Sequence, residues 1–383
     1  MRIGINGYEA VVPRFGFNKE TGLPNRVGSS EFCFQLLTRL KSMDSKNEYS
    51  IFLPIPPSKD LPLPDKHWRY EVFQSKKLWT ILGLSKKLRN YKLDVFFSPT
   101  HYLPLYTKAP SVVSILDVSY LYFPQLFKKK DLYQLKTWGG FSIKKAKKII
   151  TISNSSKNDI IKMYKVPEER VEVIYPGIKE LKTSNLKLKN MEELNKRFEI
   201  SSPYILFVGT LQPRKNIKRL IEAFSLLKEQ ETRSKKLQLV IVGKKGWQFE
   251  DILDAPKKYG VGDRVRFLDS VTDEDLPALY KNALCFCLPS LYEGFGLPIL
   301  EAMQYGCPVA TSNISSLPEA GGDAAVYFNP EDPEDIAKSL KSIIQNSELR
   351  DKLIRKGYEQ VKKFSWEKSA KQTLRVLEDA AKK

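Results

Sequence analysis

Residues 284–301 read LCFCLPSLYEGFGLPILE, and this stretch decides the fold. Its first five residues form a short apolar run that ends at Pro289 and Ser290, which predicts a buried parallel strand. Pro298 suits the first position of a helix, because proline has no backbone N–H to leave unpaired, and apolar residues follow it at helical spacing. The stretch therefore predicts a strand, a glycine-rich loop and a helix in immediate succession.

The loop within this stretch predicts a ligand site at the start of the helix. Gly294 and Gly296 let a ligand approach the backbone, and the free N–H groups at a helix N-terminus favour a phosphate. Glu293 and Glu301 lie around the loop, and carboxylates accept hydrogen bonds from hydroxyl groups. The combination indicates a sugar-nucleotide site, although either acid taken alone also suits a helix dipole or a surface loop.

Short apolar runs alternate with helical stretches along the whole chain. In the first half, the expected strands are Arg2–Asn6, Tyr49–Leu53, Tyr70–Phe73, Asp94–Phe97, Val112–Leu116, Ile149–Ile152 and Val171–Ile174. In the second half, they are Tyr204–Val208, Leu237–Val242, Arg264–Leu268, Leu284–Leu288, Val309–Thr311 and Ala325–Phe328. This rhythm predicts an α/β fold with two doubly wound, Rossmann-like domains that face a cleft. Ligands of such sheets bind beyond the carboxyl ends of the strands, so loops 209–216 and 289–297 are expected at the cleft.

A second motif, GTLQPRKN at residues 209–216, follows an expected strand and precedes another helical stretch. Asn216 is expected to cap that helix. Arg214 and Lys215 then lie at the same sheet edge as Glu293, where two cations would neutralise a diphosphate without a metal ion. The alternative is an ordinary solvated pair of surface cations.

The acidic run Asp273-Glu274-Asp275 follows Thr272, so we expect these acids in the first turn of a helix rather than around a metal ion. No Walker loop and no Gly-x-Gly-x-x-Gly follows an expected strand, which argues against a kinase or a dehydrogenase. The four cysteines lie in apolar contexts and predict buried free thiols. With only two histidines in the chain, a zinc site is disfavoured.

The positive charge is concentrated in the first half of the chain. Residues 1–185 hold 31 Lys and Arg against 16 Asp and Glu, so they carry most of the net charge of +19. Clusters at residues 128–130 and 144–148 suit anionic lipid headgroups or an acidic acceptor, or simply a solvated face. Nucleic acid is not expected, because no recognised nucleic-acid module accompanies the charge. The chain lacks an apolar run of roughly 18 residues and a signal-peptide core, which predicts a cytoplasmic location.

The quoted motifs resemble those of the family 4 retaining glycosyltransferases, which have the two-domain GT-B architecture. The resemblance extends through GCPVA at residues 306–310, LPE at 317–319 and FSWE at 364–367. TISNSS at 151–156 and VIYPG at 173–177 also resemble segments at the end of the family's acceptor domain, so the resemblance covers most of residues 148–380 and is weaker before them. The GTLQPRKN motif at residues 209–216 resembles that of a mannosyltransferase-rich subset, which slightly favours GDP-mannose as the donor.

The resemblance implies a division of labour among the donor-site residues. Glu301 would accept hydrogen bonds from the ribose, and Glu293 would contact the donor sugar near the reacting centre. Arg214 and Lys215 would hold the diphosphate. The backbone N–H groups of Phe295, Gly296 and Leu297 would assist them.

Several positions depart from the family pattern. Thr210 stands where many relatives carry Arg, so Arg214 would supply that charge. Leu116 stands where many relatives carry His, directly before Asp117, and His101 in the preceding strand-end loop is a candidate to replace it. Asp117 and His101 are therefore candidate catalytic residues. Gly28 lies in a segment that resembles the first glycine-rich loop of the family's acceptor domain, and it is a candidate donor-binding residue. The alternative is an ordinary loop glycine.

From these observations we predict a retaining, metal-independent hexosyltransferase with no bound cofactor. It would use a GDP- or UDP-sugar and a glycan or lipid-linked acceptor in cell-surface polysaccharide synthesis, in the cytoplasm or on the cytosolic face of an anionic membrane. The expected parts are an acceptor-binding domain over residues 1–180, a linker over 181–203, a donor domain over 204–362 and a C-terminal helix over 363–383 that packs on the N-terminal domain. The alternatives are a sugar-nucleotide epimerase or phosphorylase on this scaffold, and a non-catalytic basic binding protein.

Overall fold

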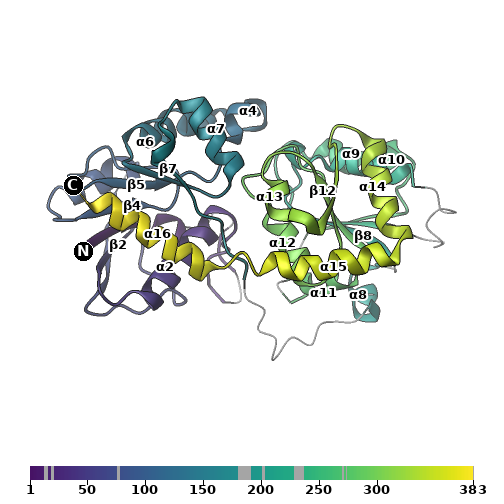
Figure 1. Cartoon of the computed structure of the whole chain (residues 1–383), viewed down its shortest axis with the longest axis horizontal. Helices are drawn as coiled ribbons and strands as arrows, with labels where there is room; N and C mark the ends of the chain where they lie inside the picture. The colour runs from purple at the N-terminus through teal and green to yellow at the C-terminus, as the bar shows by residue number, and fades with distance from the viewer. Residues whose placement is uncertain are drawn as a thin grey trace. The chain divides into compact units, whose positions relative to one another are not determined.

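The structure, a computed structural model, describes all residues except 13–15, 19–20, 76–77, 180–190, 201–202, 228–236, 270, 273 and 383. The chain divides into two compact units, Met1–Gly177 with Ser365–Lys383, and Ile178–Phe364. Each unit contains a parallel β-sheet covered by helices on both faces (Figure 1). The predicted α/β fold with two doubly wound sheets is confirmed.

The first unit is built on a seven-stranded sheet with the order β3-β2-β1-β4-β5-β6-β7. Its strands are β1 Arg2–Asn6, β2 Glu48–Leu53, β3 Trp68–Val72, β4 Val95–Ser98, β5 Ser111–Ser114, β6 Lys148–Thr151 and β7 Val171–Val173. Its helices are α1 Tyr8–Val11, α2 Ser29–Met43, η1 Trp79–Gly83, α3 Leu84–Leu88, α4 Ser119–Tyr122, η2 Pro124–Leu126, α5 Lys129–Gln134, η3 Leu135–Gly139, α6 Gly140–Lys145, α7 Asn154–Tyr164, η4 Glu168–Arg170 and α16 Trp366–Ala381. The strand order reverses next to β1, so the loops after β1 and β4 open at the usual ligand position of such sheets.

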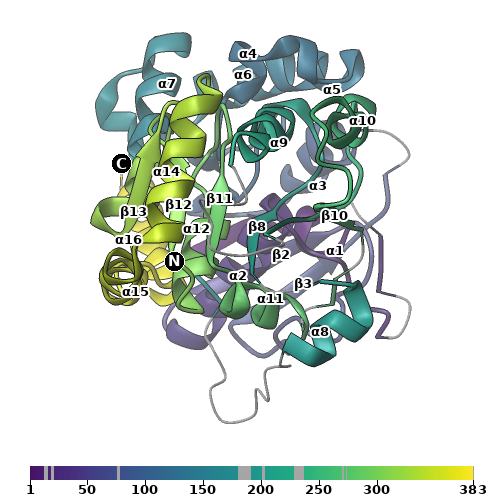
Figure 2. The ribbon, with the colours of Figure 1, turned by 90° about the vertical axis from the view of Figure 1, so that its right-hand side faces the viewer.

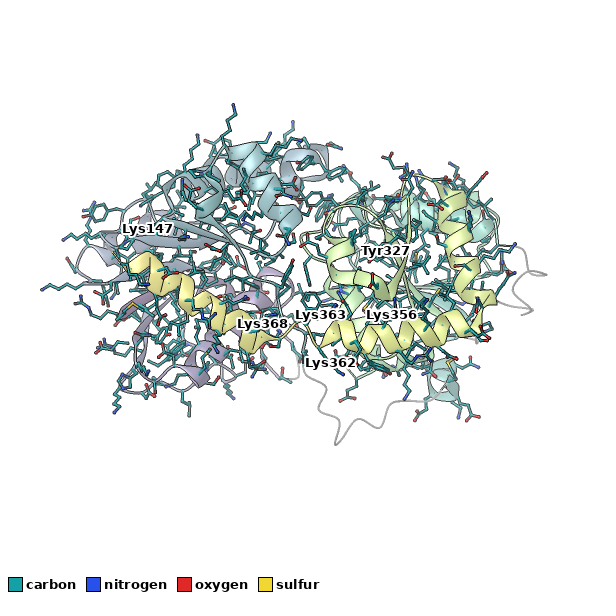
Figure 3. All side chains as sticks on the ribbon, in the orientation of Figure 1. Lys147, Tyr327, Lys356, Lys362, Lys363 and Lys368 are labelled. Carbon is teal, nitrogen blue, oxygen red and sulfur yellow. The ribbon has the colours of Figure 1, made fainter. Side chains whose placement is uncertain are left out.

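The C-terminal helix α16 belongs to the first unit and packs against α2 (Figure 1). Phe32 of α2 meets Trp366 at the start of α16, with ring centroids 5.9 Å apart. A side chain at Gly177 would collide with the backbone of Trp366, because a Cβ there would lie 2.1 Å from the Trp366 nitrogen. Near the other end of α16, the Lys147 ammonium donates to the Lys382 carbonyl at 2.5 Å (Figure 3). Helix α16 is thus fastened at both ends.

The second unit is built on a six-stranded sheet with the order β10-β9-β8-β11-β12-β13. Its strands are β8 Tyr204–Val208, β9 Gln238–Val242, β10 Val265–Leu268, β11 Cys285–Leu288, β12 Val309–Ser312 and β13 Ala325–Phe328. Its helices are α8 Met191–Phe198, η5 Pro213–Lys215, α9 Ile217–Ser225, α10 Glu250–Lys258, α11 Leu276–Asn282, α12 Leu297–Gln304, α13 Leu317–Gly321, η7 Gly322–Ala324, α14 Pro333–Gln345 and α15 Ser347–Val361. Helices α9, α10 and α14 lie on one side of this sheet, and α11, α12 and α15 lie on the other (Figure 2).

The expected strands all occur, with ends that differ by at most two residues. Strand β5 ends at Ser114 rather than Leu116, because the chain turns toward α4 with the Ser119 N–H bonded to Asp117 Oδ1. The expected linker, residues 181–203, lies partly outside the described residues. Its described part contains helix α8, which buries Leu194, so this segment is not a bare connection.

The structure also shows the state of the cysteines and the hydrophobicity of the helices. Each of the four cysteines is buried and unpaired, as predicted. Within the described residues, no helix combines the length and the hydrophobicity that crossing a membrane requires.

Candidate functional site

The loop after β8 approaches the end of β9 closely. Gly209 has a φ of +157°, and its N–H donates to the Val242 carbonyl at 2.9 Å. A Cβ on Gly243 would lie 1.9 Å from the Gly209 oxygen, so only glycine fits at that position. Thr210 follows, half-buried, and the chain then enters the short turn η5 that carries Arg214 and Lys215.

Asn216 occupies the position before α9, as predicted, but its side chain does not cap that helix. Its amide instead donates to the carbonyls of Pro289 and Pro330, at 3.0 and 2.7 Å. The prediction of a side-chain cap was wrong, because Asn216 has a left-handed backbone with φ of +57° and its amide finds tertiary partners. This contact ties the loop after β8 to the loop after β11.

The two loops bring the predicted acid and the two predicted cations together. Lys215 Nζ lies 2.6 Å from Glu293 Oε1, and Arg214 Nη1 lies 3.1 Å from Glu293 Oε2. The Arg214 guanidinium also donates to the Tyr292 carbonyl, and the Leu291 N–H donates to the Arg214 carbonyl at 2.9 Å. Both cations therefore reach the start of the glycine-rich loop from across the sheet edge.

This cluster is nearly closed to solvent. The Glu293, Lys215 and Arg214 side chains are 10%, 11% and 15% exposed. Burial alone would raise the pKa of Glu293, but the charges of Lys215 and Arg214 outweigh it and lower that pKa from 4.5 to about 2. The carboxylate stays ionised at neutral pH, and the cluster carries one net positive charge.

Two serines that the sequence did not single out hold the Glu293 backbone. The hydroxyls of Ser315 and Ser316 donate to the Glu293 carbonyl at 2.7 and 2.8 Å, and the Glu293 N–H donates to Ser315 Oγ at 3.2 Å. They lie in the loop between β12 and α13, and no local motif marks them. These bonds fix the direction in which the loop enters α12.

Helix α12 begins directly after the glycine-rich loop. Gly296 precedes it with φ of +106°, and a Cβ there would lie 2.8 Å from Leu317 Cδ2. Leu297 is the first helical residue, and Pro298 stands within the first turn. The Phe295 ring is buried against Phe364, with centroids 5.3 Å apart. The N–H groups at this helix start therefore lie beside the charged cluster, in a geometry that suits a phosphate.

Glu301 lies one turn into α12 and is held by a buried tyrosine. The Tyr280 hydroxyl donates to Glu301 Oε2 at 2.9 Å, and the Tyr280 ring stacks on Tyr305 with centroids 5.9 Å apart and planes at 10°. Burial, followed by the Glu301 charge, raises the pKa of Tyr280 well above its usual value, so this hydroxyl remains a donor. Sequence reasoning missed Tyr280, which lies on α11.

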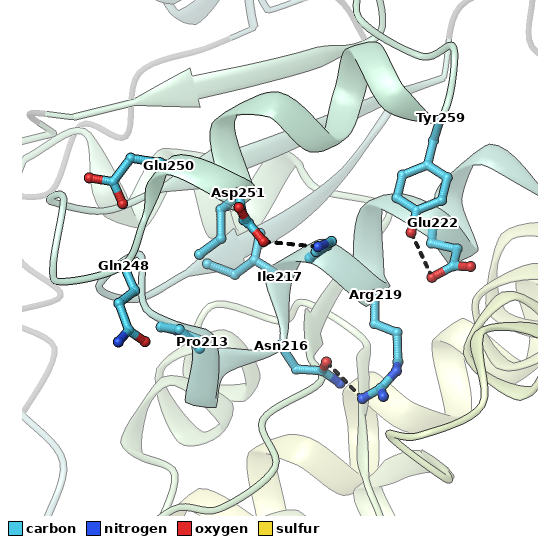
Figure 4. A pocket seen from close by; sticks show the side chains of 11 residues that line it. Pro213, Asn216, Ile217, Arg219, Glu222, Gln248, Glu250, Asp251 and Tyr259 are labelled. Atoms are coloured by element: carbon cyan, nitrogen blue, oxygen red, sulfur yellow. Dashed lines mark hydrogen bonds and ion pairs between the residues drawn. The ribbon is translucent and has the colours of Figure 1, made fainter. Parts of the chain in front are cut away.

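A groove of about 700 Å³ flanks the loop after β8, between α9 and α10 (Figure 4). An ion pair and a hydrogen bond join residues that line this groove. Lys218 Nζ lies 3.0 Å from Asp251 Oδ2, and the Tyr259 hydroxyl lies 3.0 Å from Glu222 Oε2. It shares Pro213 and Asn216 with the loop that carries the cations.

The remaining predicted residues lie in the first unit. His101 and Asp117 follow the neighbouring strands β4 and β5. Burial lowers the pKa of His101, and the nearby Asp117 charge opposes that shift. Leu116 has an apolar side chain and contributes a backbone carbonyl, which accepts a hydrogen bond from Ser156 Oγ at 3.1 Å. Gly28 precedes α2 with φ of +56° and open space around it.

The acidic run does not begin a helix as expected. Asp273 lies outside the described residues, and α11 begins only at Leu276. Asp275 is fully buried, pairs with Arg197 at 2.8 Å and accepts from Thr272 Oγ1 at 2.7 Å, so it fastens α8 to α11. Among the described residues, no group of three or more His, Cys, Asp or Glu side chains could hold a metal ion.

The chain is similar to known protein families and to several individual proteins. Residues 189–360 match the family described as glycosyl transferases group 1, and residues 36–180 match glycosyltransferase family 4. The O-antigen chain mannosyltransferase B of Escherichia coli is 35% identical over 288 residues, which cover 75% of this chain and 74% of that protein. The O-antigen chain mannosyltransferase RfbU of Salmonella typhimurium is 30% identical, over 70% of this chain and 69% of that protein.

A solved structure resembles the entire chain in fold. The Anabaena protein HepE, in complex with UDP and glucose, superposes with a TM-score of 0.70 at 17% identity, over 99% of this chain and 100% of that chain. These comparisons do not favour an epimerase, a phosphorylase or a non-catalytic binding protein. The chain belongs to the glycosyl transferases group 1 family and is a glycosyltransferase of GT-B architecture.

Proposed function

We propose that the protein transfers a hexose, with mannose favoured, from a GDP- or UDP-sugar to a glycan or lipid-linked acceptor in cell-surface polysaccharide synthesis. One observation carries the proposal: the buried cluster of Glu293, Arg214 and Lys215 beside the N-terminus of α12. The names of the two O-antigen mannosyltransferases support the choice of mannose and of polysaccharide synthesis.

In this proposal the cluster receives the diphosphate of the donor. Arg214 and Lys215 share one carboxylate, so their two positive charges exceed the charge of Glu293 by one. A diphosphate placed at the N–H groups of Phe295, Gly296 and Leu297 would meet that excess charge. Glu301 would accept hydrogen bonds from the ribose hydroxyls, and Glu293 would contact the sugar while holding the two cations.

The chemical step follows from this placement. Cleavage of the bond between the sugar and the diphosphate leaves negative charge on the phosphate oxygen, and the nearby cations and N–H groups stabilise that charge. We propose that the acceptor attacks the face from which the leaving group departs, so that configuration is retained. A phosphate oxygen would take the acceptor proton, and no metal ion is required. His101 and Asp117 would orient the acceptor or the sugar, with His101 uncharged because its pKa is lowered.

We further propose that the protein works in the cytoplasm, at the cytosolic face of an anionic membrane. Support comes from the basic first half, where Lys128, Lys129 and Lys130 are all exposed at the start of α5. A cluster of exposed cations near a surface is attracted to acidic lipid headgroups.

The test is donor cleavage by the purified chain. GDP-mannose, UDP-glucose, UDP-galactose and UDP-N-acetylglucosamine are each offered with a lipid extract from cells that make surface polysaccharide, and release of nucleoside diphosphate is measured. We expect release with one of these donors that depends on the extract, and loss of release in Glu301→Ala. An NMR spectrum of the product that shows an inverted anomeric centre would contradict retention, and unchanged rates in Glu301→Ala would contradict the site.

A further inference from the structure

The first unit contains a pocket of about 310 Å³ at the carboxyl end of its sheet. Four aromatic side chains line it, and they come from four separate segments of the chain. They are Tyr8, Trp79, Tyr102 and Trp138. The pocket volume lies at the lower end of the range of about 300–1,000 Å³ that is usual for small-molecule sites.

Contacts with residues outside the pocket hold part of its wall. The Trp79 indole N–H donates to the Phe73 carbonyl at 2.9 Å, and the Trp79 ring stacks on Phe73 with centroids 4.7 Å apart. Tyr8 lies against Trp79, with centroids 5.5 Å apart. Asn6, at the end of β1, donates to Ser98 Oγ of β4 at 3.0 Å. The site is therefore rigid on the side formed by β1, β4 and η1.

The chemistry of the lining suits a neutral sugar. A hexose has an apolar face of C–H groups, which an aromatic ring covers, and a rim of hydroxyls, which amides and carboxylates bind. Gln134, Glu9, Thr80 and Thr100 supply polar groups around the rings. Among the described residues that line the pocket none is Lys or Arg, in contrast to the cluster around Glu293, so a diphosphate has no partner here.

An apolar rim continues from the pocket. Leu78 lines the pocket just before η1 and is 43% exposed, and Leu82 on η1 is 49% exposed. Leu105, 39% exposed, is tied to that turn because its N–H donates to the Ile81 carbonyl at 3.1 Å. Exposed leucines that adjoin a polar and aromatic pocket fit a ligand with a polar head and an apolar tail.

We propose that this pocket takes the terminal hexose of the acceptor and that the acceptor is lipid-linked, with its apolar tail along Leu78, Leu82 and Leu105. The proposal rests on the function proposed above, because it assigns the second substrate of that reaction. Thr100 and Tyr102 line the pocket, and they are the sequence neighbours of the candidate catalytic residue His101.

Binding of simple glycosides without donor tests the pocket. Saturation-transfer NMR is recorded with the methyl glycosides of mannose, glucose, galactose and N-acetylglucosamine. We expect at least one to bind, and Trp138→Ala and Gln134→Ala to weaken it by about tenfold. The matched control is Tyr133→Ala, next to Gln134 on α5, because the Tyr133 side chain is 66% exposed and does not line the pocket. Binding unchanged in Trp138→Ala and Gln134→Ala, binding displaced by GDP or UDP, or no binding of any glycoside overturns the proposal.

The tail is tested with the octyl glycoside of the same sugar, below its micelle concentration. We expect it to bind about tenfold more tightly than the methyl glycoside, because part of the octyl chain leaves water. Leu82→Ser should abolish that advantage, and Leu226→Ser, 46% exposed on the second unit, should preserve it. Equal affinities for both glycosides would overturn the lipid-linked assignment.

A thermal shift with GDP and UDP separates this proposal from the donor proposal. Glycoside binding without any nucleotide shift would leave the pocket standing and remove the proposed donor site. A nucleotide shift without glycoside binding would remove the pocket alone.

Discussion

The Lys215 ammonium lies 2.6 Å from Glu293 Oε1, although 78 positions separate the two residues in the sequence. Both side chains are nearly buried, and Arg214 approaches the other carboxylate oxygen. Two parallel strands, β8 and β11, are neighbours in the sheet, so the loops that follow them meet at one edge. A charge cluster is thereby assembled from two motifs that lie far apart in the sequence.

Loss of either cation should weaken diphosphate binding. For Arg214→Ala we expect the affinity for GDP or UDP to fall by about 1.5–3 kcal/mol, the usual value of a charge-assisted hydrogen bond. The affinity for the nucleoside, which lacks phosphate, should not change. Isothermal calorimetry measures both. Lys218→Ala is the control, since Lys218 is on α9 and pairs with the exposed Asp251. Equal losses for nucleoside and diphosphate would refute the assignment.

Acid should remove a contribution that Glu293 makes to stability. Its pKa is about 2 in the folded protein and ordinarily 4.5. Because the pKa is depressed in the folded protein, ionised Glu293 stabilises the fold at pH values above 4.5. This contribution to the free energy of unfolding, about 3 kcal/mol in total, is lost as the pH falls from 4.5 to 2. Urea unfolding of Glu293→Gln should therefore show a shallower pH dependence below pH 5 than the wild type. Glu331→Gln, an exposed loop acid, should keep the wild-type slope.

The sequence predicted the strands well because buried parallel strands are short apolar runs between turn residues, and β1, β8 and β13 have the expected ends. It also placed Glu293 and Arg214 at one edge. It could not show that they form an ion pair, because strand order is a tertiary property. Asn216 illustrates the same limit: the local capping rule predicted its position, but the carbonyls of Pro289 and Pro330 decide its partners.

The serine hydroxyls that hold the Glu293 backbone could not be predicted from the amino-acid sequence. Ser315 and Ser316 hold the Glu293 carbonyl from 22 and 23 positions away, and serine is too common in loops to indicate such a role. His101 and Asp117 were selected through strand ends and a resemblance. Their electrostatic coupling depends on β4 and β5 being neighbours.

Gly296 should not tolerate a side chain. Its φ of +106° disfavours any other residue, and a Cβ would lie 2.8 Å from Leu317 Cδ2. We expect Gly296→Ala to lower the free energy of unfolding by about 1–3 kcal/mol and to weaken GDP or UDP binding, because the start of α12 must move. Gly262→Ala is a matched control, as no atom lies within 4 Å of its added Cβ. Wild-type stability in Gly296→Ala would contradict this geometry.

Charge reversal at the start of α5 should abolish membrane attraction. Replacing Lys128, Lys129 and Lys130 by Glu should prevent flotation with vesicles that contain phosphatidylglycerol, while the wild type floats with these and not with neutral vesicles. The control reverses Lys352, Arg355 and Lys356, exposed cations of α15, with the same change in net charge. Equal flotation of the wild type with both vesicle types would refute membrane contact.

Tyr280 should act on the nucleotide through Glu301. Tyr280→Phe removes the hydroxyl that donates to Glu301 Oε2 at 2.9 Å and leaves the ring stacked on Tyr305. If Glu301 binds the ribose, the affinity for GDP or UDP should fall by about threefold to tenfold, the value of one hydrogen bond. The affinity for the 2′,3′-dideoxy nucleotide should not change, because that ligand lacks the hydroxyls that Glu301 would bind. Tyr259→Phe, which removes a similar bond to Glu222, should affect neither ligand. An equal loss for both nucleotides would mean that Tyr280 only stabilises α12.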